Sequence, residues 1–373
     1  MRFIHLSDLH IGKRVNGFSM LEDQRFILKQ ILEIAENTDA AVIAGDVYDK
    51  TIPPAEAVEL FDEFLTSLSE KHIPVLIISG NHDSAERIAF ASKIINKQNI
   101  YIAGVFRGSL DKITIDDIDF YLMPFIKPVH VKQFFPDTKI ESYEDAVKTI
   151  LQNTNIDTTR KNVLIAHQFI TCSHHETLRC DSESVSVGGI DNIDVSVFDC
   201  FDYVALGHIH NAQSIGRDSV RYAGSPLKYS FSEARHNKSV TVVTIDEEVK
   251  TELIPLTPIR DMREIKGDIS SILSPEIYTL ANTDDYIHVT LTDDDEILDV
   301  ISKVRAVYPN VMAIDFCNNR TKALRDVNPI ENTEQKSPVD LFGDFYEIQN
   351  NEKMNEDEEA IVRSIFESYG DDR

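Results

Sequence analysis

The chain of 373 residues contains no tryptophan, only four cysteines and few basic side chains. Cys172, Cys180, Cys200 and Cys317 are widely spaced and form no CxxC pair, which disfavours a disulfide framework and fits a reducing, cytoplasmic setting. No apolar run reaches the ~18 residues that a membrane-spanning helix needs, so we expect no membrane contact. The N-terminal MRFIHLSDLH lacks a long apolar segment and a small-residue cleavage site, so we do not expect a signal peptide.

Basic side chains are scarce relative to acidic ones, 37 against 63, and the formal net charge is −26. This argues against simple adhesion to nucleic acid, because binding to phosphates is mostly electrostatic. The charge is uneven, since residues 326–373 hold 14 acidic and 4 basic side chains. Carboxylates that bind divalent cations also count as negative here, so an acidic balance is compatible with a metal site.

Apolar runs alternate with helical patterns over residues 1–250. RFIHL, AAVIA and PVLII predict strands, and the two segments between them have the apolar spacing of amphipathic helices. This βαβαβ order predicts an α/β sheet in which ligand groups collect at the carboxyl ends of the strands. Five further strand-like runs follow, which is too many for one doubly wound sheet. We therefore expect two sheets packed face to face, with helices outside.

Two smaller segments follow this domain. Residues 251–325 predict strands around one helix, which indicates a small α+β capping domain. From residue 326 the composition turns acidic and polar. We expect a linker and two short amphipathic helices over residues 326–373.

Five short polar motifs each follow an apolar run that ends at or near a small residue. They are Asp8-x-His10, Asp46, Asn81-His82, His167 and His208-x-His210. Because alternate residues of a strand point to the same side, we expect each DxH or HxH pair to face one pocket. A lone Asn or His after a strand is more often a cap or a satisfied polar residue. The hypothesis of a shared site therefore rests on all five motifs occurring together.

The predicted ligands are oxygen and nitrogen atoms without a thiolate, which suits Mn²⁺, Fe or Zn²⁺ better than Ca²⁺. Seven candidate ligands exceed what one ion takes. Two ions about 3.5–4 Å apart, sharing one carboxylate, would use them all, and such a pair supports phosphoryl transfer to water. Asp46 is our choice for the bridging carboxylate. Asp49 fits either an acid beside or at the start of a helix or a group that supports the site near the leaving phosphate.

These five motifs, in this order over residues 8–210, resemble the pattern of the calcineurin-like metallophosphoesterase superfamily. The resemblance implies that Asp8, His10, Asp46 and His210 hold one ion. It implies further that Asp46, Asn81, His167 and His208 hold the other. His82 is then a catalytic residue that protonates the leaving oxygen or stabilises developing charge, and Asp83 orients it.

Longer segments, among them MRFIHLSDLHIGK, ISGNHDSAERI and YAGSPLKYSFSE, resemble the SbcD family of nuclease subunits. The resemblance is dense over residues 1–250. It implies a Mn²⁺-dependent, nucleoid-associated nuclease with 3′–5′ exonuclease and endonuclease activity on DNA ends and hairpins. The main alternative is a metallophosphoesterase that acts on small phosphodiesters or nucleotides. A histidine of archaeal and eukaryotic relatives is replaced here by Asp49, which puts a phosphate-contacting role at this position in doubt.

The resemblance also implies a partner, an SbcC-type ATPase, and a homodimer within a heterotetramer. The chain itself has no GxxxxGK[ST] phosphate loop. Apolar stripes in the acidic tail predict a surface for a partner groove, or for folding back onto the chain's own domain. Their residues are Leu341, Phe342, Phe345, Ile361, Ile365 and Phe366. Candidate DNA contacts near the metal motifs are Lys13, Arg14, Arg87 and Lys228, for each of which a solvated charged face is the plain alternative.

Overall fold

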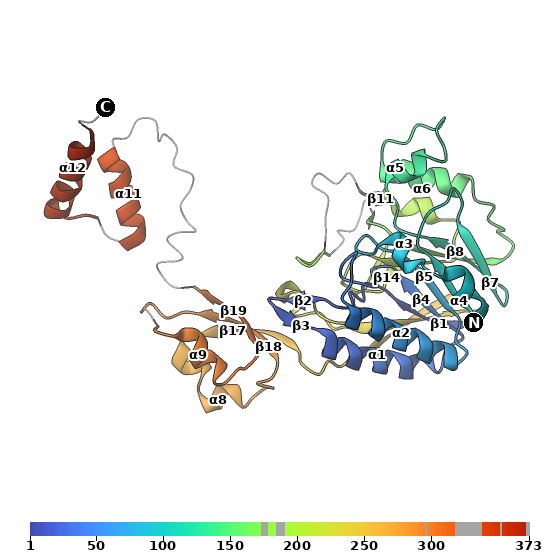
Figure 1. Cartoon of the computed structure of the whole chain (residues 1–373), viewed down its shortest axis with the longest axis horizontal. Helices are drawn as coiled ribbons and strands as arrows, with labels where there is room; N and C mark the ends of the chain where they lie inside the picture. The colour runs from blue at the N-terminus through green and yellow to red at the C-terminus, as the bar shows by residue number, and fades with distance from the viewer. Residues whose placement is uncertain (173–177, 184–190, 296, 318–337, 351–352, 371–373) are drawn as a thin grey trace. The chain divides into compact units, whose positions relative to one another are not determined.

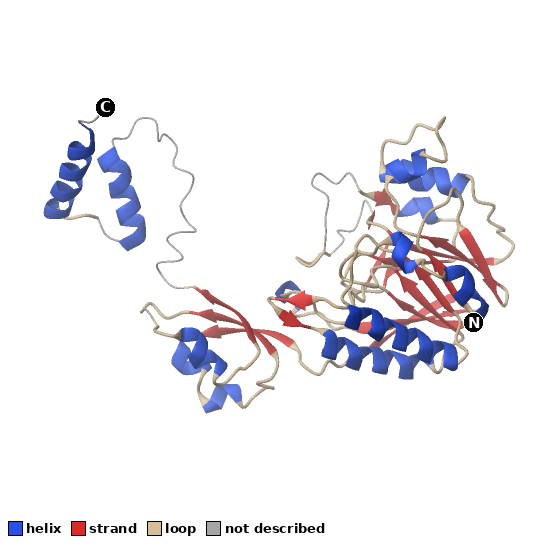
Figure 2. Ribbon diagram, in the orientation of Figure 1, coloured by secondary structure: helices blue, strands red, loops and turns tan. Residues whose placement is uncertain are grey.

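The computed structural model describes residues 1–172, 178–183, 191–295, 297–317, 338–350 and 353–370. These form two compact units, Met1–Met262 and Arg263–Arg373. The first unit contains two six-stranded sheets, drawn with their helices in Figures 1 and 2. The sandwich predicted from the number of strands is therefore confirmed.

The first sheet has the order β16-β15-β1-β4-β5-β6. Its strands are β1 (Arg2–Leu6), β4 (Ala40–Ala44), β5 (Val75–Ile78), β6 (Ile100–Ala103), β15 (Ser239–Ile245) and β16 (Val249–Pro255). β1, β4, β5 and β6 are parallel, whereas β15 and β16 run antiparallel at one edge. The expected domain boundary at residue 250 lies inside β16, which pairs with β15 along its whole length.

The second sheet has the order β13-β14-β12-β9-β8-β7. Its strands are β7 (Asp111–Ile115), β8 (Ile118–Met123), β9 (Lys161–His167), β12 (Tyr203–Gly207), β13 (Gln213–Ile215) and β14 (Arg217–Tyr222). The four central strands are parallel, so their carboxyl ends share one edge. Short pairs flank the sheets: β2 (Arg14–Val15) with β3 (Phe18–Ser19), and β10 (Ile170–Thr171) with β11 (Ile193–Asp194).

Helices cover the outer faces of both sheets. They are α1 (Leu21–Ala35), α2 (Ala55–Glu70), α3 (Ala85–Ile88), α4 (Ser92–Ile95), α5 (Pro128–Lys132) and α6 (Tyr143–Gln152), with 3₁₀ turns η1 (Asn96–Gln98), η2 (Val195–Phe198) and η3 (Phe231–Glu233). α2 begins directly after Pro54, whose fixed φ of −65° suits a helix start. In α1, Ile27, Ile31 and Ala35 recur every four residues and are fully buried.

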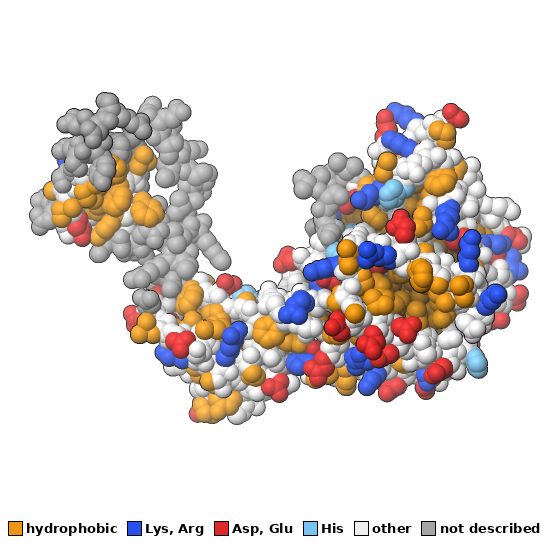
Figure 3. Space-filling model, viewed as in Figure 1, with side chains coloured by type: hydrophobic (Ala, Val, Ile, Leu, Met, Phe, Trp, Pro, Cys, Tyr) orange, Lys and Arg blue, Asp and Glu red, His pale blue; other side chains and the backbone are white. Residues whose placement is uncertain are grey.

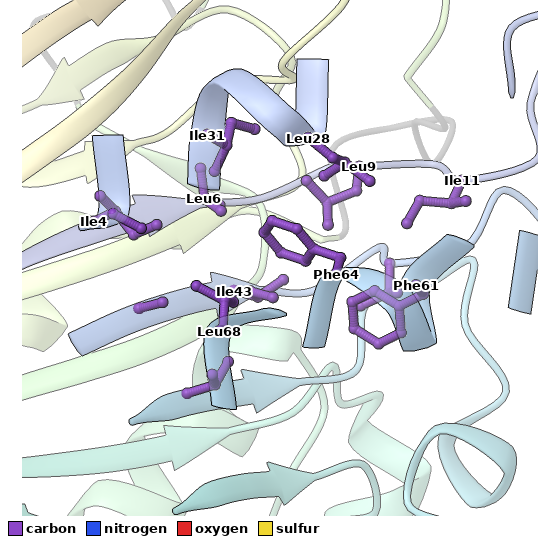
Figure 4. Packing of buried hydrophobic residues seen from close by; sticks show 14 of the residues in the cluster. Ile4, Leu6, Leu9, Ile11, Leu28, Ile31, Ile43, Phe61, Phe64 and Leu68 are labelled. Atoms are coloured by element: carbon purple, nitrogen blue, oxygen red, sulfur yellow. The ribbon is translucent and has the colours of Figure 1, made fainter. Parts of the chain in front are cut away.

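Three apolar clusters hold the layers together. Figure 4 labels side chains of the first cluster, where Phe61, Phe64 and Leu68 of α2 lie near Ile43 of β4. A second cluster packs α6 against the outer face of the other sheet. The third, which includes Phe3 of β1 and residues of β8 and β12, fills the space between the sheets. Burial on both faces explains why the central strands are continuous apolar runs rather than alternating ones.

The second unit contains a three-stranded sheet and a separate pair of helices. The sheet orders β17 (Met262–Gly267), β18 (Tyr286–Leu291) and β19 (Val311–Phe316), with α7 (Ile269–Ile272), α8 (Pro275–Tyr278) and α9 (Val300–Arg305). The tail forms α11 (Pro338–Asn350) and α12 (Glu356–Gly370). The two helices touch through Phe342 and Phe366, whose ring centroids are 6.3 Å apart. No helix in the described part of the chain has the length and apolar character of a membrane span.

Candidate metal centre

All eight side chains predicted from the five motifs come together at the carboxyl ends of parallel strands. Asp8 and His10 follow β1, Asp46 follows β4, Asn81 and His82 follow β5, His167 ends β9, and His208 and His210 follow β12. The first five belong to one sheet and the last three to the other. The site therefore lies where the carboxyl edges of the two sheets meet.

The first group contains Asp8, His10 and His210, whose potential ligand atoms all lie within 4.8 Å of one another. Their side chains are buried, and Nε2 of His10 lies 3.1 Å from Nε2 of His210. Asp46 is adjacent, with Oδ2 3.8 Å from Nε2 of His10. The group thus brings together one carboxylate and two imidazoles, a donor set that Mn²⁺, Fe and Zn²⁺ take.

The second group surrounds Oδ1 of Asn81. This oxygen lies 3.0 Å from Nε2 of His167 and 3.0 Å from Nδ1 of His208. Oδ2 of Asp46 lies 3.3 Å from the same nitrogen of His167. Asp46 thus borders both groups, as expected for a shared carboxylate.

The surroundings of His167 favour a positive charge between its ring and the carboxylate of Asp46. Nδ1 of His167 is 2.7 Å from the main-chain oxygen of Ala44, which only accepts, so Nδ1 carries the proton. In a neutral ring, Nε2 would then point its lone pair at an oxygen of Asp46. Burial alone would lower the pKa of His167, but the carboxylate of Asp46 outweighs burial and raises the pKa to about 9. A divalent cation between these atoms satisfies them without that proton.

At three of the other candidate ligands the shift in pKa comes mainly from burial. Desolvation lowers the pKa of His208 to about 3 and the pKa of His10 well below its usual value. Both imidazoles therefore remain neutral and keep a lone pair at neutral pH. Burial raises the pKa of Asp8. Neutral imidazoles are the state in which histidine binds a metal, whereas Asp8 must lose the proton that burial favours, as a bound cation would cause it to do.

Four of the candidate ligands have left-handed backbone conformations. Asp8, His10, Asp46 and His208 have φ angles of 52°, 44°, 50° and 104°. Such angles are uncommon for residues other than glycine, although Asp and His tolerate them better than most. Main-chain hydrogen bonds from Asp8 to Gly45 and from His10 to Asp46 fix the two loops against each other. Backbone strain of this kind persists where surrounding structure enforces it, which is typical of functional sites.

Two glycines let the strands of the site approach closely. A Cβ atom on Gly80 would lie 2.1 Å from Oδ1 of Asp46. One on Gly207 would lie 2.0 Å from the main-chain oxygen of Ala44 and 2.6 Å from Nδ1 of His167. Any side chain at either position would displace a ligand or a strand.

His82 lies beside the first group, with its ring centroid 4.8 Å from that of His10. Its Nδ1 is 3.0 Å from the main-chain oxygen of Asp49, and its main-chain N–H donates to Asp46 at 2.8 Å. The carboxylate of Asp83 accepts instead from main-chain N–H groups of Val47, Tyr48 and Gly80. Asp83 therefore links the loop after β4 to the loop after β5. The hydrogen bond that orients the ring of His82 is made by the main-chain oxygen of Asp49, whereas we expected one from Asp83.

The side chain of Asp49 lies behind the site. Its Oδ1 accepts from Nζ of Lys13 at 2.7 Å and is 3.8 Å from Nδ1 of His10, beyond hydrogen-bond range. Of the two interpretations of Asp49, the geometry favours a group that supports the site over a helix-start acid. Lys13 therefore already has an ion-pair partner, and only 14% of its side chain is exposed.

The four candidate DNA contacts differ in accessibility. Arg14 and Arg87 are exposed. Lys228 is mostly buried, and its Nζ bonds the main-chain oxygen of Ala234 and Asp261. Lys13 and Lys228 are therefore already paired, which leaves Arg14 and Arg87 as the better candidates. Sequence reasoning missed Arg179, whose guanidinium lies 3.8 Å over the ring of Phe169, next to His208.

A buried network around His210 was also missed. Oε1 of Glu233 is 3.4 Å from Nδ1 of His210, and Oε2 is 2.5 Å from Nζ of Lys238. Burial alone would raise the pKa of Glu233, but the hydrogen bond from His210 and the charge of Lys238 outweigh it and hold the pKa well below its usual value. Glu233 gave no signal in the sequence because a glutamate a few residues from a lysine is common on protein surfaces.

Cys180, Glu233 and His236 form a further group of potential ligands within 4.8 Å. The carboxylate of Glu233 already has an ammonium partner, and burial raises the pKa of the Cys180 thiol. This group is therefore a poor cation site. His174 and His175, which lie between Cys172 and Cys180 in the sequence, are outside the described residues.

Comparison with known proteins agrees with this geometry. Residues 1–212 match the calcineurin-like phosphoesterase family, and residues 258–350 match the type 5 capsule protein repressor C-terminal domain. The chain is therefore a calcineurin-like phosphoesterase, a hydrolase of a family that uses divalent metal ions.

A more specific assignment follows from a curated relative. The SbcD subunit of the nuclease SbcCD from Staphylococcus epidermidis is 36% identical over 322 residues, which cover 84% of this chain and 85% of the relative. The chain belongs to the family of this nuclease subunit. A solved structure, TT1561 of Thermus thermophilus, matches 68% of this chain and 98% of its own, with 11% identity and a TM-score of 0.36.

Proposed function

We propose that this protein is a Mn²⁺-dependent DNA nuclease with 3′–5′ exonuclease and endonuclease activity on ends and hairpins, acting with an SbcC-type ATPase. The observation that carries the proposal is the meeting of two groups of buried ligands at Asp46. The relative named above is a nuclease subunit, which directs the substrate assignment to DNA.

In this proposal, one ion is held by Asp8, His10, Asp46 and His210. The other is held by Asp46, Asn81, His167 and His208. The mixed carboxylate, amide and imidazole set suits Mn²⁺, Fe or Zn²⁺ better than Ca²⁺, and we assign Mn²⁺ among these from the family resemblance. Such a pair supplies a deprotonated water near neutral pH and neutralises charge on the attacked phosphate.

The residue that we assign to proton transfer is His82. Because the carbonyl of Asp49 can only accept, Nδ1 of His82 carries a proton, and Nε2 is the atom that exchanges one. A protonated ring donates from Nε2 to the leaving oxygen, and the fixed Nδ1 keeps this nitrogen directed at the substrate. Arg14, Arg87 and Arg179 would hold neighbouring phosphates by charge, while the strongly acidic remainder of the chain requires further DNA-binding surface from partners.

The helix pair α11–α12 is our candidate for the ATPase-binding surface. Phe342, Phe345, Ile361, Ile365 and Phe366 are all exposed although the two helices touch. Exposed aromatic and aliphatic side chains at helical spacing suit an apolar groove on a partner. We assign the three-stranded sheet of the second unit to capping the DNA.

A second exposed apolar surface supports a homodimer. Hydrophobic side chains gather over α2, α3 and α4 in Figure 3. They include Ile52, Val58, Phe90 and Ile94, and Phe90 is 82% exposed. A patch of this kind on a soluble domain marks a protein contact.

The test is degradation of end-labelled duplex DNA with Mn²⁺ by wild type and by His82→Gln. We expect wild type to cut and EDTA to stop it. The variant should lose about 10²–10⁴-fold in rate, because proton transfer contributes that much, while binding two Mn²⁺ ions as before. Intact DNA in the presence of SbcC and ATP, together with hydrolysis of bis(p-nitrophenyl) phosphate, would instead support the small-phosphodiester alternative.

A further inference from the structure

Glu233 is fully buried beside the metal centre and has no role in the reaction described above. Its Oε1 accepts from Oγ of Ser182 at 2.6 Å, and Oγ of Ser182 lies 2.9 Å from Nδ1 of His210. The same carboxylate oxygen is 3.4 Å from Nδ1 of His210 directly. The Nδ1–H of His210 therefore points at a hydroxyl and a carboxylate together, which leaves Nε2 of that ring as the nitrogen with a lone pair.

Two of the other candidate histidines, His167 and His10, are held differently. Nδ1 of His167 donates to a main-chain oxygen, that of Ala44. Nδ1 of His10 lies 3.8 Å from the nearest oxygen of Asp49 and makes no hydrogen bond within the described residues. His210 is thus distinguished by a buried carboxylate at its distal nitrogen. A carboxylate in this position fixes the ring tautomer and raises the basicity of the ligating nitrogen.

Lys238 fixes both members of this arrangement. Its Nζ is 2.5 Å from Oε2 of Glu233 and 2.9 Å from the main-chain oxygen of His210. It also donates to Oγ of Ser225 at 2.8 Å. Because the ammonium compensates the buried charge, Glu233 can remain an ionised acceptor without a cation of its own.

We propose that Glu233, held by Lys238, is a positioning residue that orients His210 and strengthens ion binding at the group of Asp8, His10 and His210. This inference rests on the proposed function, because it needs ions at that centre. It assigns Glu233 no contact with substrate, and Lys238 no contact with DNA.

The experiment is titration of the full chain with Mn²⁺, with free Mn²⁺ followed by electron paramagnetic resonance. Wild type should bind two ions. In Glu233→Gln we expect one of the two affinities to fall by about 10-fold or more, the usual effect of losing an outer partner of a ligand. Asp119→Asn is the matched control, because Asp119 is a buried carboxylate paired with Lys112 and Arg160 that is outside the candidate centre.

A double-mutant cycle tests whether Glu233 acts through His210. In a His210→Gln background, Glu233→Gln should change Mn²⁺ affinity by less than about 2-fold, because the residue it positions is gone. An additional loss as large as that in wild type would overturn the proposal. So would unchanged Mn²⁺ affinity in Glu233→Gln alone.

Removal of Glu233 alone leaves the buried ammonium of Lys238 without its carboxylate, which can destabilise the fold. The variant Glu233→Gln/Lys238→Met removes both charges, and thermal unfolding in EDTA establishes that it is folded. It should show the same loss at one site. If wild type itself bound no Mn²⁺, both the metal centre and the role of Glu233 would be refuted. If both Glu233 variants bound Mn²⁺ as wild type does, only the role of Glu233 would be refuted.

Discussion

At the scale of single residues, the candidate metal centre depends on glycines without a Cβ atom as much as on the candidate ligands. Gly80 has no Cβ where an added atom would meet a carboxylate oxygen of Asp46 at 2.1 Å. We predict that Gly80→Ala weakens Mn²⁺ binding by at least about 10-fold, because Asp46 must move away from both groups of ligands. Isothermal titration measures it. Gly267→Ala is the control, since its Cβ would find neighbours at 3.5 Å, an ordinary contact.

His5 makes the free energy of unfolding depend on pH. The ring of His5 bonds the hydroxyl of Tyr203 at 2.9 Å and the carbonyl of Leu206 at 3.2 Å, and burial lowers its pKa to about 3. The unfolded ring gains a proton near pH 6.5, whereas the native ring does not. The stability that the neutral ring contributes is therefore complete above pH 6.5 and is lost as the pH falls towards 3.

We predict that His5→Gln flattens this dependence. Between about pH 4 and 6, the free energy of unfolding should change less steeply than in wild type, by about 1.4 kcal/mol per pH unit. Urea unfolding in EDTA measures it, since ions are then absent from both proteins. Parallel curves for the two proteins would contradict the assignment.

At the scale of elements, β16 decides where the first domain ends. Ser239–Ile245 pairs with Val249–Pro255 residue by residue, and Val240 and Val242 of β15 are buried. We predict that a chain ending at residue 262 folds and binds Mn²⁺, whereas one ending at residue 250 loses an edge strand and aggregates. Thermal unfolding and size-exclusion chromatography distinguish the two. Equal behaviour of both chains would show that β16 is dispensable.

Sequence patterns predicted most of the sandwich because buried parallel strands are short apolar runs and α1 and α2 have strong helical spacing. They predicted the candidate ligands because each stands at the end of a strand or within a few residues after it. They assigned most of β16 to the following domain because its strand-like residues continue, with prolines, into the first strand of that domain. Glu233 and Lys238 could not be recognised, since only the fold brings them beneath His210. The same holds for the main-chain oxygen of Asp49 at His82.

At the scale of the whole molecule, the tail and the catalytic domain should be separable. We predict that deletion of residues 335–373 abolishes SbcC binding but leaves Mn²⁺-dependent hydrolysis of bis(p-nitrophenyl) phosphate unchanged. Phe345→Ser/Ile365→Ser, which alters two exposed apolar side chains, should weaken SbcC binding in the full chain. Arg363→Ser is the control, because Arg363 pairs with Glu359 of its own helix. Retained capture of SbcC by the deletion variant would refute the assignment.

The candidate ligands belong to two sheets that are also joined by apolar contacts and by hydrogen bonds such as those of His5 to Tyr203 and Leu206. Ions held by Asp8 and His210, or by Asn81 and His167, would act as cross-links between the layers and would favour the native state by mass action, by about 2.7 kcal/mol per ion at a concentration of 100 times its Kd. We predict that EDTA lowers the unfolding temperature and that Mn²⁺ restores it. Hydrogen exchange should quicken first in β1 and β12, which lead into ligands. Loss of metal would then weaken the sandwich as well as stop the reaction, so a metal-starved cell would hold less of the folded protein.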